Sequence, residues 1–238
     1  MNRPTEPPVT GLPAAVLWDL DGTLVDTEPS WLAAELALAR RHGGTWSEAD
    51  GLALVGNDMI ASGRYIRDRM GLPLTPEQIV DELFDDMVAI VETGVVARPG
   101  ALELLGELRS LHIPCALVTM SYRRMVEPIV AQLAPTAFDA LVTGDEVAQG
   151  KPHPEAYLTA ARLLGVAPER CIAIEDSVTG ATSAQAAGAR VVVVPNRVEV
   201  PAVPGRTVLA TLERLRVVDL VAAAASAAGE APVNIRGR

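Results

Sequence analysis

The sequence predicts an α/β fold in which a parallel β-sheet is covered by helices on both faces and interrupted, after its first strand, by an all-helical insertion. Five short apolar runs alternate with amphipathic stretches of helical period, as is typical of a parallel sheet buried on both sides. Residues 29–96 break this alternation, because they contain helical patterns and no convincing strand. We therefore predict a Rossmann-like, three-layer core with a helical domain inserted into it.

The core is predicted from apolar runs and from the amphipathic stretches between them. The predicted strands are Ala14–Trp18, Ile113–Thr119, Ala140–Thr143, Cys171–Ile174 and Arg190–Val194. The predicted core helices are Gly100–Leu111, Arg123–Leu133, Pro154–Leu164 and Val178–Ala187. Two of these helices run up to Gly165 and Gly188, a residue type suited to the left-handed backbone that closes a helix.

The insertion is predicted to contain four helices: Ser30–His42, Glu48–Val55, Asp58–Met70 and Thr75–Glu92. The last has a clear start, since Thr75 can cap it, Pro76 suits its first position and Gln78 completes a capping box. We therefore divide the chain into a flexible tail (residues 1–13), a core (14–28 and 97–228), the insertion (29–96) and a second flexible tail (229–238).

Composition excludes several classes of protein. The 238 residues carry a net charge of −10, so phosphate backbones and anionic membranes are disfavoured partners. Aromatic residues make up only 3%, which argues against base-stacking surfaces, and the two cysteines do not make a disulfide framework. No apolar run is long enough for a membrane helix, and the N-terminal stretch lacks the pattern of a signal peptide. We expect a cytoplasmic monomer or weak homodimer without nucleic-acid or membrane partners.

Chemically active side chains follow four of the predicted strands or the loops after them. They are Asp19 and Asp21, Thr119 and Ser121, Lys151, and Glu175 with Asp176. Ligands of open parallel sheets bind beyond the carboxyl ends of the strands, so we expect these side chains to meet in one cleft. Four carboxylates cannot all ionise there without a counter-charge, and Mg²⁺ together with one lysine supplies it. Such a site suits phosphate, with one Asp attacking phosphorus and another protonating the leaving oxygen.

The same residues resemble the four motifs of the haloacid dehalogenase superfamily. The run Asp19-Leu-Asp-Gly-Thr-Leu-Val-Asp-Thr-Glu28 is similar to the first motif, and Thr119 after an apolar strand to the second. Lys151 before Pro152 resembles the third motif, and Glu175-Asp-Ser177 with Gly180 the fourth. The helical insertion resembles the C1 cap of the phosphoglycolate phosphatase and β-phosphoglucomutase branch. The resemblance runs from Ala14 to Asn196 in the expected order.

The resemblance implies a role for each of these residues. Asp19 would be the nucleophile that forms an aspartyl-phosphate, and Asp21 the general acid that later activates water. Asp19, the Asp21 carbonyl, Glu175 and Asp176 would hold Mg²⁺, while Thr119 and Lys151 would bind the phosphate. Ser121, two residues after Thr119, is a further candidate for phosphate binding. The expected activity is hydrolysis of a small phosphorylated metabolite. The expected cap motion has hinges near Asp26–Pro29 and Val96–Pro99.

Several alternatives stay open at the level of sequence. Ser121 either donates to phosphate or caps the following helix, and Thr27 and Glu28 either touch substrate or start a helix. A phosphosugar mutase shares the motifs and the cap, but the similar mutases have an Arg soon after a cap glycine, where this chain reads Val55-Gly-Asn-Asp58. Arg64 could take that Arg's place. A non-catalytic binding protein on the same fold is a third possibility.

Overall fold

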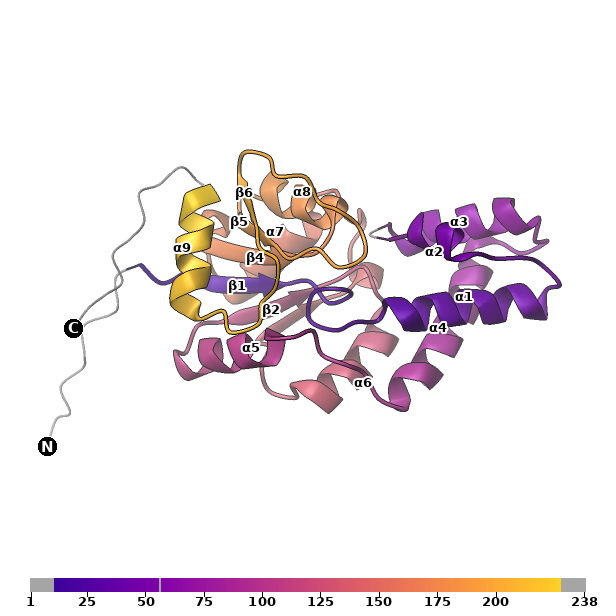
Figure 1. Ribbon diagram of the computed structural model, residues 1–238, viewed down its shortest axis with the longest axis horizontal. Helices are drawn as coiled ribbons and strands as arrows, with labels where there is room; N and C mark the ends of the chain where they lie inside the picture. The colour runs from indigo at the N-terminus through magenta and orange to yellow at the C-terminus, as the bar shows by residue number, and fades with distance from the viewer. Residues whose placement is uncertain (1–10, 56, 228–238) are drawn as a thin grey trace, which may run out of the picture.

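The structure is a computed structural model that describes residues 11–55 and 57–227. Residues 1–10 of the predicted N-terminal tail, and the whole predicted tail at 229–238, lie outside the described residues. The described chain forms a sheet with helices on both faces and a helical extension at one end (Figure 1). No helix among the described residues is long and apolar enough to cross a membrane.

The sheet has six parallel strands in the order β3-β2-β1-β4-β5-β6. They are β1 (Ala15–Trp18), β2 (Cys115–Val118), β3 (Ala140–Val142), β4 (Cys171–Glu175), β5 (Arg190–Val193) and β6 (Arg206–Val208). Trp18 at the end of β1 is in register with Leu117 of β2 and Ile174 of β4. The residues that follow these three strands therefore emerge side by side at one edge of the sheet.

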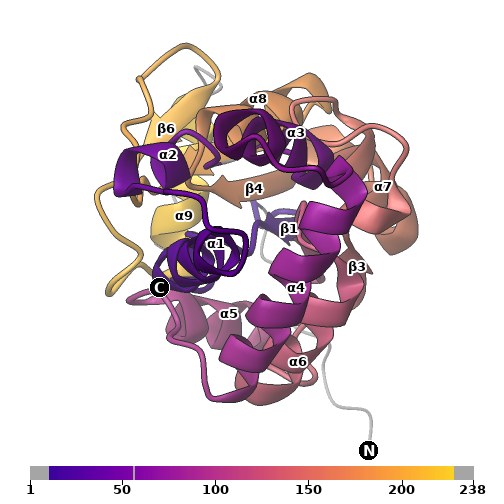
Figure 2. The same ribbon diagram turned by 90° about the vertical axis from the view of Figure 1, so that its right-hand side faces the viewer.

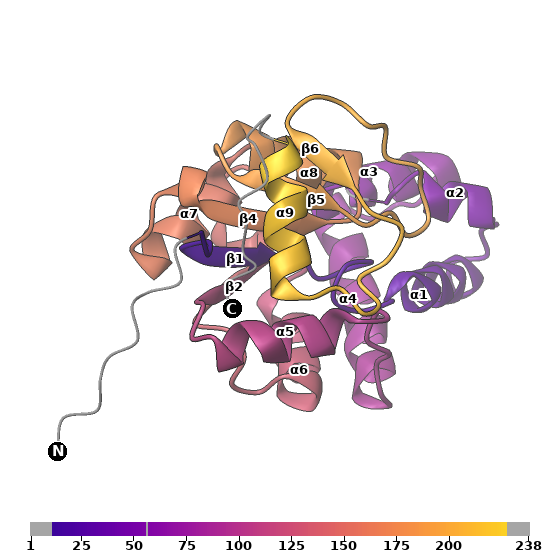
Figure 3. The same cartoon turned by 60° about the vertical axis from the view of Figure 1, so that its left-hand side comes forward.

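Alternation along the buried strands divides the core into two layers. Val16 and Trp18 face α5 (Ala101–Ser110), α6 (Arg123–Leu133) and α9 (Val217–Ala227), whereas Ala15 and Leu17 face α7 (Glu155–Leu164) and α8 (Val178–Ala186). Figure 3 shows α9 with β5 and β6, and α5 with α6 on the same side of the sheet. The predicted three-layer core is confirmed.

The helical insertion follows β1 and consists of α1 (Glu28–Arg41), α2 (Glu48–Leu52), α3 (Met59–Met70) and α4 (Pro76–Glu92). Viewed from that end, α1, α3 and α4 are arranged around the end of β1 (Figure 2). Helix α4 also packs along core helix α6, where the Arg124 guanidinium lies 5.0 Å from the centre of the Phe84 ring. The capping box predicted at Thr75 is present, with Thr75 Oγ1 accepting from Gln78 N.

The two segments that join insertion and core are bonded to each other. The Asp26 amide donates to the Val96 carbonyl (2.9 Å), the Arg98 amide donates to the Leu24 carbonyl (2.9 Å), and Val25 pairs with Ala97 in an antiparallel bridge. The chain therefore leaves the core and returns to it at one place.

Most predicted elements are present with bounds shifted by one to three residues. The predicted strand Ile113–Thr119 shortens to Cys115–Val118, and the predicted helix Glu48–Val55 shortens to Glu48–Leu52. Gly165 and Gly188 take positive φ values of 67° and 95°, as predicted for the ends of α7 and α8. Among the β-strands and α-helices of the described residues, β6 and α9 were not predicted.

Candidate active site

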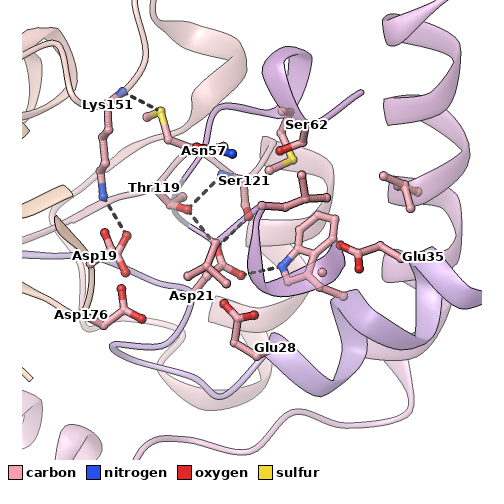
Figure 4. A pocket seen from close by; sticks show the side chains of 18 residues that line it. Asp19, Asp21, Glu28, Glu35, Asn57, Ser62, Thr119, Ser121, Lys151 and Asp176 are labelled. Carbon is pink, nitrogen blue, oxygen red and sulfur yellow. Dashed lines mark hydrogen bonds and ion pairs between the residues drawn. The ribbon is translucent and has the colours of Figure 1, made fainter. Parts of the chain in front are cut away.

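The side chains predicted from the four motifs meet at the carboxyl edge of the sheet. Asp19 follows β1, Thr119 follows β2, Glu175 ends β4 and Asp176 follows it. Lys151 arrives from the loop that precedes α7 and is 5% exposed. Figure 4 shows Lys151, Asp19, Asp176 and Asp21 around one cavity. The parallel register described above brings these residues together from positions far apart in the chain.

Lys151 is held by a set of three acceptors. Its Nζ donates to Asp19 Oδ1 (2.7 Å), Glu175 Oε1 (2.6 Å) and the Val118 carbonyl (2.9 Å). Burial alone would lower the pKa of Lys151, but the two carboxylates outweigh it and raise that pKa above its usual value. Lys151 is therefore a fixed, charged donor beside Asp19.

Glu175 is fully buried and both of its oxygens have protein donors. Oε1 accepts from Lys151 and from the Tyr157 hydroxyl (2.5 Å), and Oε2 accepts from Ser177 Oγ (3.2 Å). Gly180 of α8 leaves room for this carboxylate, because a Cβ there would lie 2.0 Å from Glu175 Oε1. In this arrangement Glu175 orients Lys151.

Asp19 and Asp176 each keep one buried carboxylate oxygen, Oδ2, without a hydrogen-bond partner. Together with Glu175 they form a group whose ligand atoms lie within 4.8 Å of one another, so these three carboxyls could hold a metal ion. Gly22 lies against this group of carboxyls at a φ of +83°. A Cβ at this position would lie 2.1 Å from Asp176 Oδ2, so a glycine keeps the space beside that oxygen open. The two unpartnered oxygens fit a hard cation, which prefers oxygen ligands.

Burial and the closeness of other acids raise the pKa values of the carboxyls in this group. Burial raises the pKa of Asp19 to about 7, with Lys151 opposing the shift and Glu175 adding to it. Burial, Asp19 and Glu175 together raise the pKa of Asp176 well above its usual value. One lysine is therefore insufficient counter-charge for these acids, and a bound divalent cation would favour their ionised forms.

Asp21 is oriented by four donors from three parts of the chain. Its Oδ1 accepts from Thr27 Oγ1 (2.6 Å) and from the Trp31 indole of α1 (3.2 Å). Its Oδ2 accepts from Ser121 Oγ (2.7 Å) and Thr119 Oγ1 (3.1 Å). The Asp21 carboxylate thus points away from the unpartnered oxygens of Asp19 and Asp176 and towards the insertion (Figure 4).

These contacts decide two of the open alternatives for the polar residues. Ser121 does not cap α6, because Tyr122 holds the capping position and no side chain caps that helix. Thr27 holds the capping position of α1 without a side-chain capping bond, and its hydroxyl donates to Asp21 instead. Glu28 starts α1 and also lines the cavity.

The insertion supplies the far wall of the cavity. This wall includes Trp31 and Glu35 of α1, Gly51 of α2, Leu54, Val55 and Asn57 of the following turn, Met59 and Ser62 of α3, and Leu83 of α4. Among the described residues that line the cavity, Lys151 is the only cation. Arg64 does not line it, and Arg67 pairs with Asp68 on the surface. Asp58 is used to cap α3 by accepting from the Ala61 amide.

Some site residues were not predicted from the sequence. Tyr157 occupies an ordinary core position of an amphipathic helix, and Trp31, Glu35 and Ser62 lie in helical patterns of the insertion. None stands in a motif. A polar residue at an apolar helix position is a weak signal, and it was available for Glu35 and Ser62.

Comparison with known proteins agrees with the arrangement of the site. The family model of the haloacid dehalogenase-like hydrolases matches residues 13–188, which include every motif residue described above. The chain belongs to this family. Hexitol phosphatase A of Escherichia coli K12 is 38% identical to this hydrolase over 191 residues, which cover 78% of this chain and 84% of the relative. The phosphorylated carbohydrates phosphatase of Thermotoga maritima is 32% identical over 184 residues, covering 73% and 81%.

Solved structures show the same architecture for this hydrolase. CbbY from Rhodobacter sphaeroides, in complexes with phosphate and with xylulose-(1,5)bisphosphate, is 29% and 28% identical. Each comparison has a TM-score of 0.80 and covers 88% of this chain and 99% of CbbY. The protein is therefore a haloacid dehalogenase-like phosphatase with an inserted helical cap. Its fold, family and enzyme class, as predicted from the sequence, are confirmed.

Proposed function

We propose that the protein is a Mg²⁺-dependent phosphatase that hydrolyses the monophosphate ester of a sugar or sugar alcohol through an aspartyl-phosphate on Asp19. The observation that carries this proposal is the state of the Asp19 carboxylate. One oxygen is fixed by Lys151, and the other is buried and unpartnered, as is one oxygen of Asp176, which belongs to the same group of closely spaced carboxyls. The names of the similar E. coli and T. maritima enzymes support a phosphorylated carbohydrate as substrate.

In the first step an Asp19 oxygen attacks phosphorus, the new O–P bond forms and the bond to the ester oxygen breaks. Asp21 donates its proton to that leaving oxygen, and then accepts a proton from the water that hydrolyses the aspartyl-phosphate. Lys151 neutralises charge on Asp19 and on the phosphoryl oxygens. Thr119 and Ser121, which donate to Asp21 here, can donate to the phosphoryl group once Asp21 turns to the leaving oxygen.

Mg²⁺ would be held by Asp19, Asp176 and the Asp21 carbonyl, where it would neutralise phosphate charge. Glu175 lies within the same group, and we propose that it acts mainly by orienting Lys151. We assign residues 14–28 and 97–228 to the catalytic core and residues 29–96 to the cap. The bonded pair of segments at Asp26–Pro29 and Val96–Pro99 is the proposed hinge.

The phosphosugar mutase fits the cap less well. A mutase must hold a second phosphate on the cap side. Among the described residues that line this side of the cavity are Glu28, at the boundary between core and cap, and Glu35 of the cap, and none is a cation. Where the similar mutases carry Arg, this chain has the acidic residue Asp58, which caps α3. The cap wall therefore supports a substrate with a single phosphate.

The test is release of inorganic phosphate from a panel of hexose and hexitol monophosphates, with Mg²⁺ or with EDTA. We expect release only with Mg²⁺, its loss in Asp19→Asn, and normal release by the control Asp68→Asn, which changes an exposed carboxylate of α3. Interconversion of sugar phosphates on addition of a sugar bisphosphate, without net release, would instead identify a mutase. Release that persists in Asp19→Asn would contradict the assigned nucleophile.

A further inference from the structure

Two polar side chains of the cap face the cavity from the side opposite to Lys151 and have no role in the chemistry above. Glu35 of α1 and Ser62 of α3 are 5% and 4% exposed. Figure 4 shows both across the pocket from Asp19 and Lys151, with Asp21 between. Burying polar groups costs free energy unless they are hydrogen-bonded, so their position in this wall requires an explanation.

Glu35 is held in place from behind. Its Oε2 accepts from the Trp46 indole (2.8 Å), and this contact fixes the carboxyl group, whereas Oε1 accepts no hydrogen bond from the described residues. Gly51 of α2 makes room for the group, because a Cβ there would lie 2.8 Å from Glu35 Oε2. Burial raises the pKa of Glu35 to about 7, which agrees with a carboxyl enclosed by the cap.

Ser62 has the opposite character, because its buried hydroxyl has no hydrogen-bond partner within the described structure. Unpartnered buried hydroxyls are uncommon in folded proteins and require an explanation, and a molecule bound in the cavity would supply the missing partner of Ser62. Ser62 and Glu35 line the same cavity, so one bound molecule can contact both.

The chemistry of the two groups selects the ligand. A carboxylate accepts hydrogen bonds, whereas a serine hydroxyl both donates and accepts. A substrate hydroxyl can donate to Glu35 while a neighbouring hydroxyl accepts from Ser62. An ammonium group offers donors alone, and a second phosphate or a carboxylate would be repelled by Glu35 and Glu28.

We propose that Glu35 and Ser62 form a subsite that binds vicinal hydroxyls on the uncharged end of the substrate and thereby selects polyhydroxylated monophosphates. This inference rests on the proposed function and adds the residues that set its specificity. Trp46 and Gly51 act as positioning residues for Glu35. A site built to hydrogen-bond hydroxyls rejects analogues that lack them far more strongly than an apolar wall does.

The test compares kcat/KM for a hexitol 6-phosphate with kcat/KM for hexyl phosphate, which has the same chain length and no hydroxyls. We expect the wild-type enzyme to prefer the hexitol ester by at least about 100-fold, since several hydroxyl contacts are lost in the alkyl ester. Glu35→Gln should reduce this ratio at least about tenfold, and Ser62→Ala about threefold to tenfold. The control Glu92→Gln, at the exposed end of α4, should leave the ratio unchanged.

Ser62→Ala separates specificity from structure. Because the Ser62 hydroxyl has no partner in the fold, its removal should leave the urea unfolding midpoint unchanged or raise it while the ratio falls. A ratio that stays constant in both variants, or an equal fall for both esters, overturns the subsite, as does a wild-type preference for O-phosphoethanolamine, which carries a donating ammonium group in place of hydroxyls. If the wild type hydrolyses hexyl phosphate with Mg²⁺ but shows no preference, only this inference fails. If it hydrolyses neither ester nor any of the sugar phosphates above, the proposed function fails with it.

Discussion

Replacing Tyr157 by Phe removes one hydroxyl from the most enclosed part of the site and leaves its ring in place. That hydroxyl donates to Glu175 Oε1 at 2.5 Å, and both side chains are fully buried, so no water can take its place without a rearrangement. A hydrogen bond to a charged group contributes about 1.5–3 kcal/mol. For a chain of this size that loss lowers the melting temperature by roughly 3–12 °C.

The loss should also reach the chemistry, because Glu175 Oε1 accepts from Lys151 as well as from Tyr157. We expect Tyr157→Phe to lower kcat several-fold with little change in KM, since the Lys151 ammonium is less well oriented towards the phosphoryl group. Urea unfolding and steady-state phosphate release measure the two effects. The matched control is Tyr122→Phe, because Tyr122 stacks on Phe84 and its hydroxyl has no hydrogen bond in the described structure.

The result that refutes this reasoning is a Tyr157→Phe protein as stable as the wild type, with the control equally unaffected. The Glu175 carboxylate would then not depend on the Tyr157 hydroxyl. A loss of stability without any change in kcat would refute only the link through Lys151.

Three further changes test other parts of the site. Lys151→Met should abolish phosphate release. It should also lower the free energy of unfolding, measured in urea, by about 3–5 kcal/mol, because Asp19 and Glu175 stay buried without their cation. A variant as stable as the wild type would show that the ion pairs of Lys151 are not needed for stability. Gly180→Ala should cost about 1–3 kcal/mol and reduce kcat, because its Cβ would collide with the Glu175 carboxyl, and full activity would contradict that close approach. Glu35→Gln should alter the pH dependence of stability. The pKa of Glu35 is about 7 in the folded protein against a usual 4.5, so its favourable contribution is complete below pH 4.5 and is lost as the pH rises through 7. This difference, 7 − 4.5 = 2.5 units, amounts to at most about 3 kcal/mol. The variant should therefore gain stability over the wild type at pH 8 relative to pH 5, and an equal difference at both pH values would refute the shift.

The sequence predicts the catalytic edge of the sheet well because its residues can be recognised from short segments of sequence at the ends of the strands. Each motif residue lies within a few positions of the end of an apolar run, and parallel strands bring those ends to one edge. Asp19, Thr119 and Asp176 could therefore be placed together without knowledge of the tertiary contacts.

The contacts that orient those residues could not be predicted in the same way. Tyr157 reaches Glu175 from an opposing helix, and the Trp31 indole reaches Asp21 from the first helix of the cap. These pairs depend on how helices pack on the sheet, which periodicity alone does not specify. The cap residues that line the cavity could not be predicted either, because the residue pattern of α1 and α3 does not show which positions face a cavity.

The two unpredicted elements have distinct causes. Strand β6 has three residues, Arg206–Val208, that are partly exposed and include a charge, so no apolar run marks it. Helix α9 is dominated by Val, Leu and Ala with only Asp219 and Ser226 as polar residues, so it has no broad polar face to reveal a helical period.

The bonds between Leu24–Asp26 and Val96–Arg98 have a consequence for how such an enzyme diversifies. Because the departing and returning segments are hydrogen-bonded to each other, the cap residues form a loop whose two ends are fixed side by side on the core. Each doubling of loop length costs only about 0.6 kcal/mol in closure entropy, so the length and folding of that loop are nearly independent of the core's stability. Residues between the two segments can be lengthened, shortened or replaced while Asp19 and its partners keep their geometry. New substrate specificities can thus be acquired by exchange of one segment, without rebuilding the chemistry.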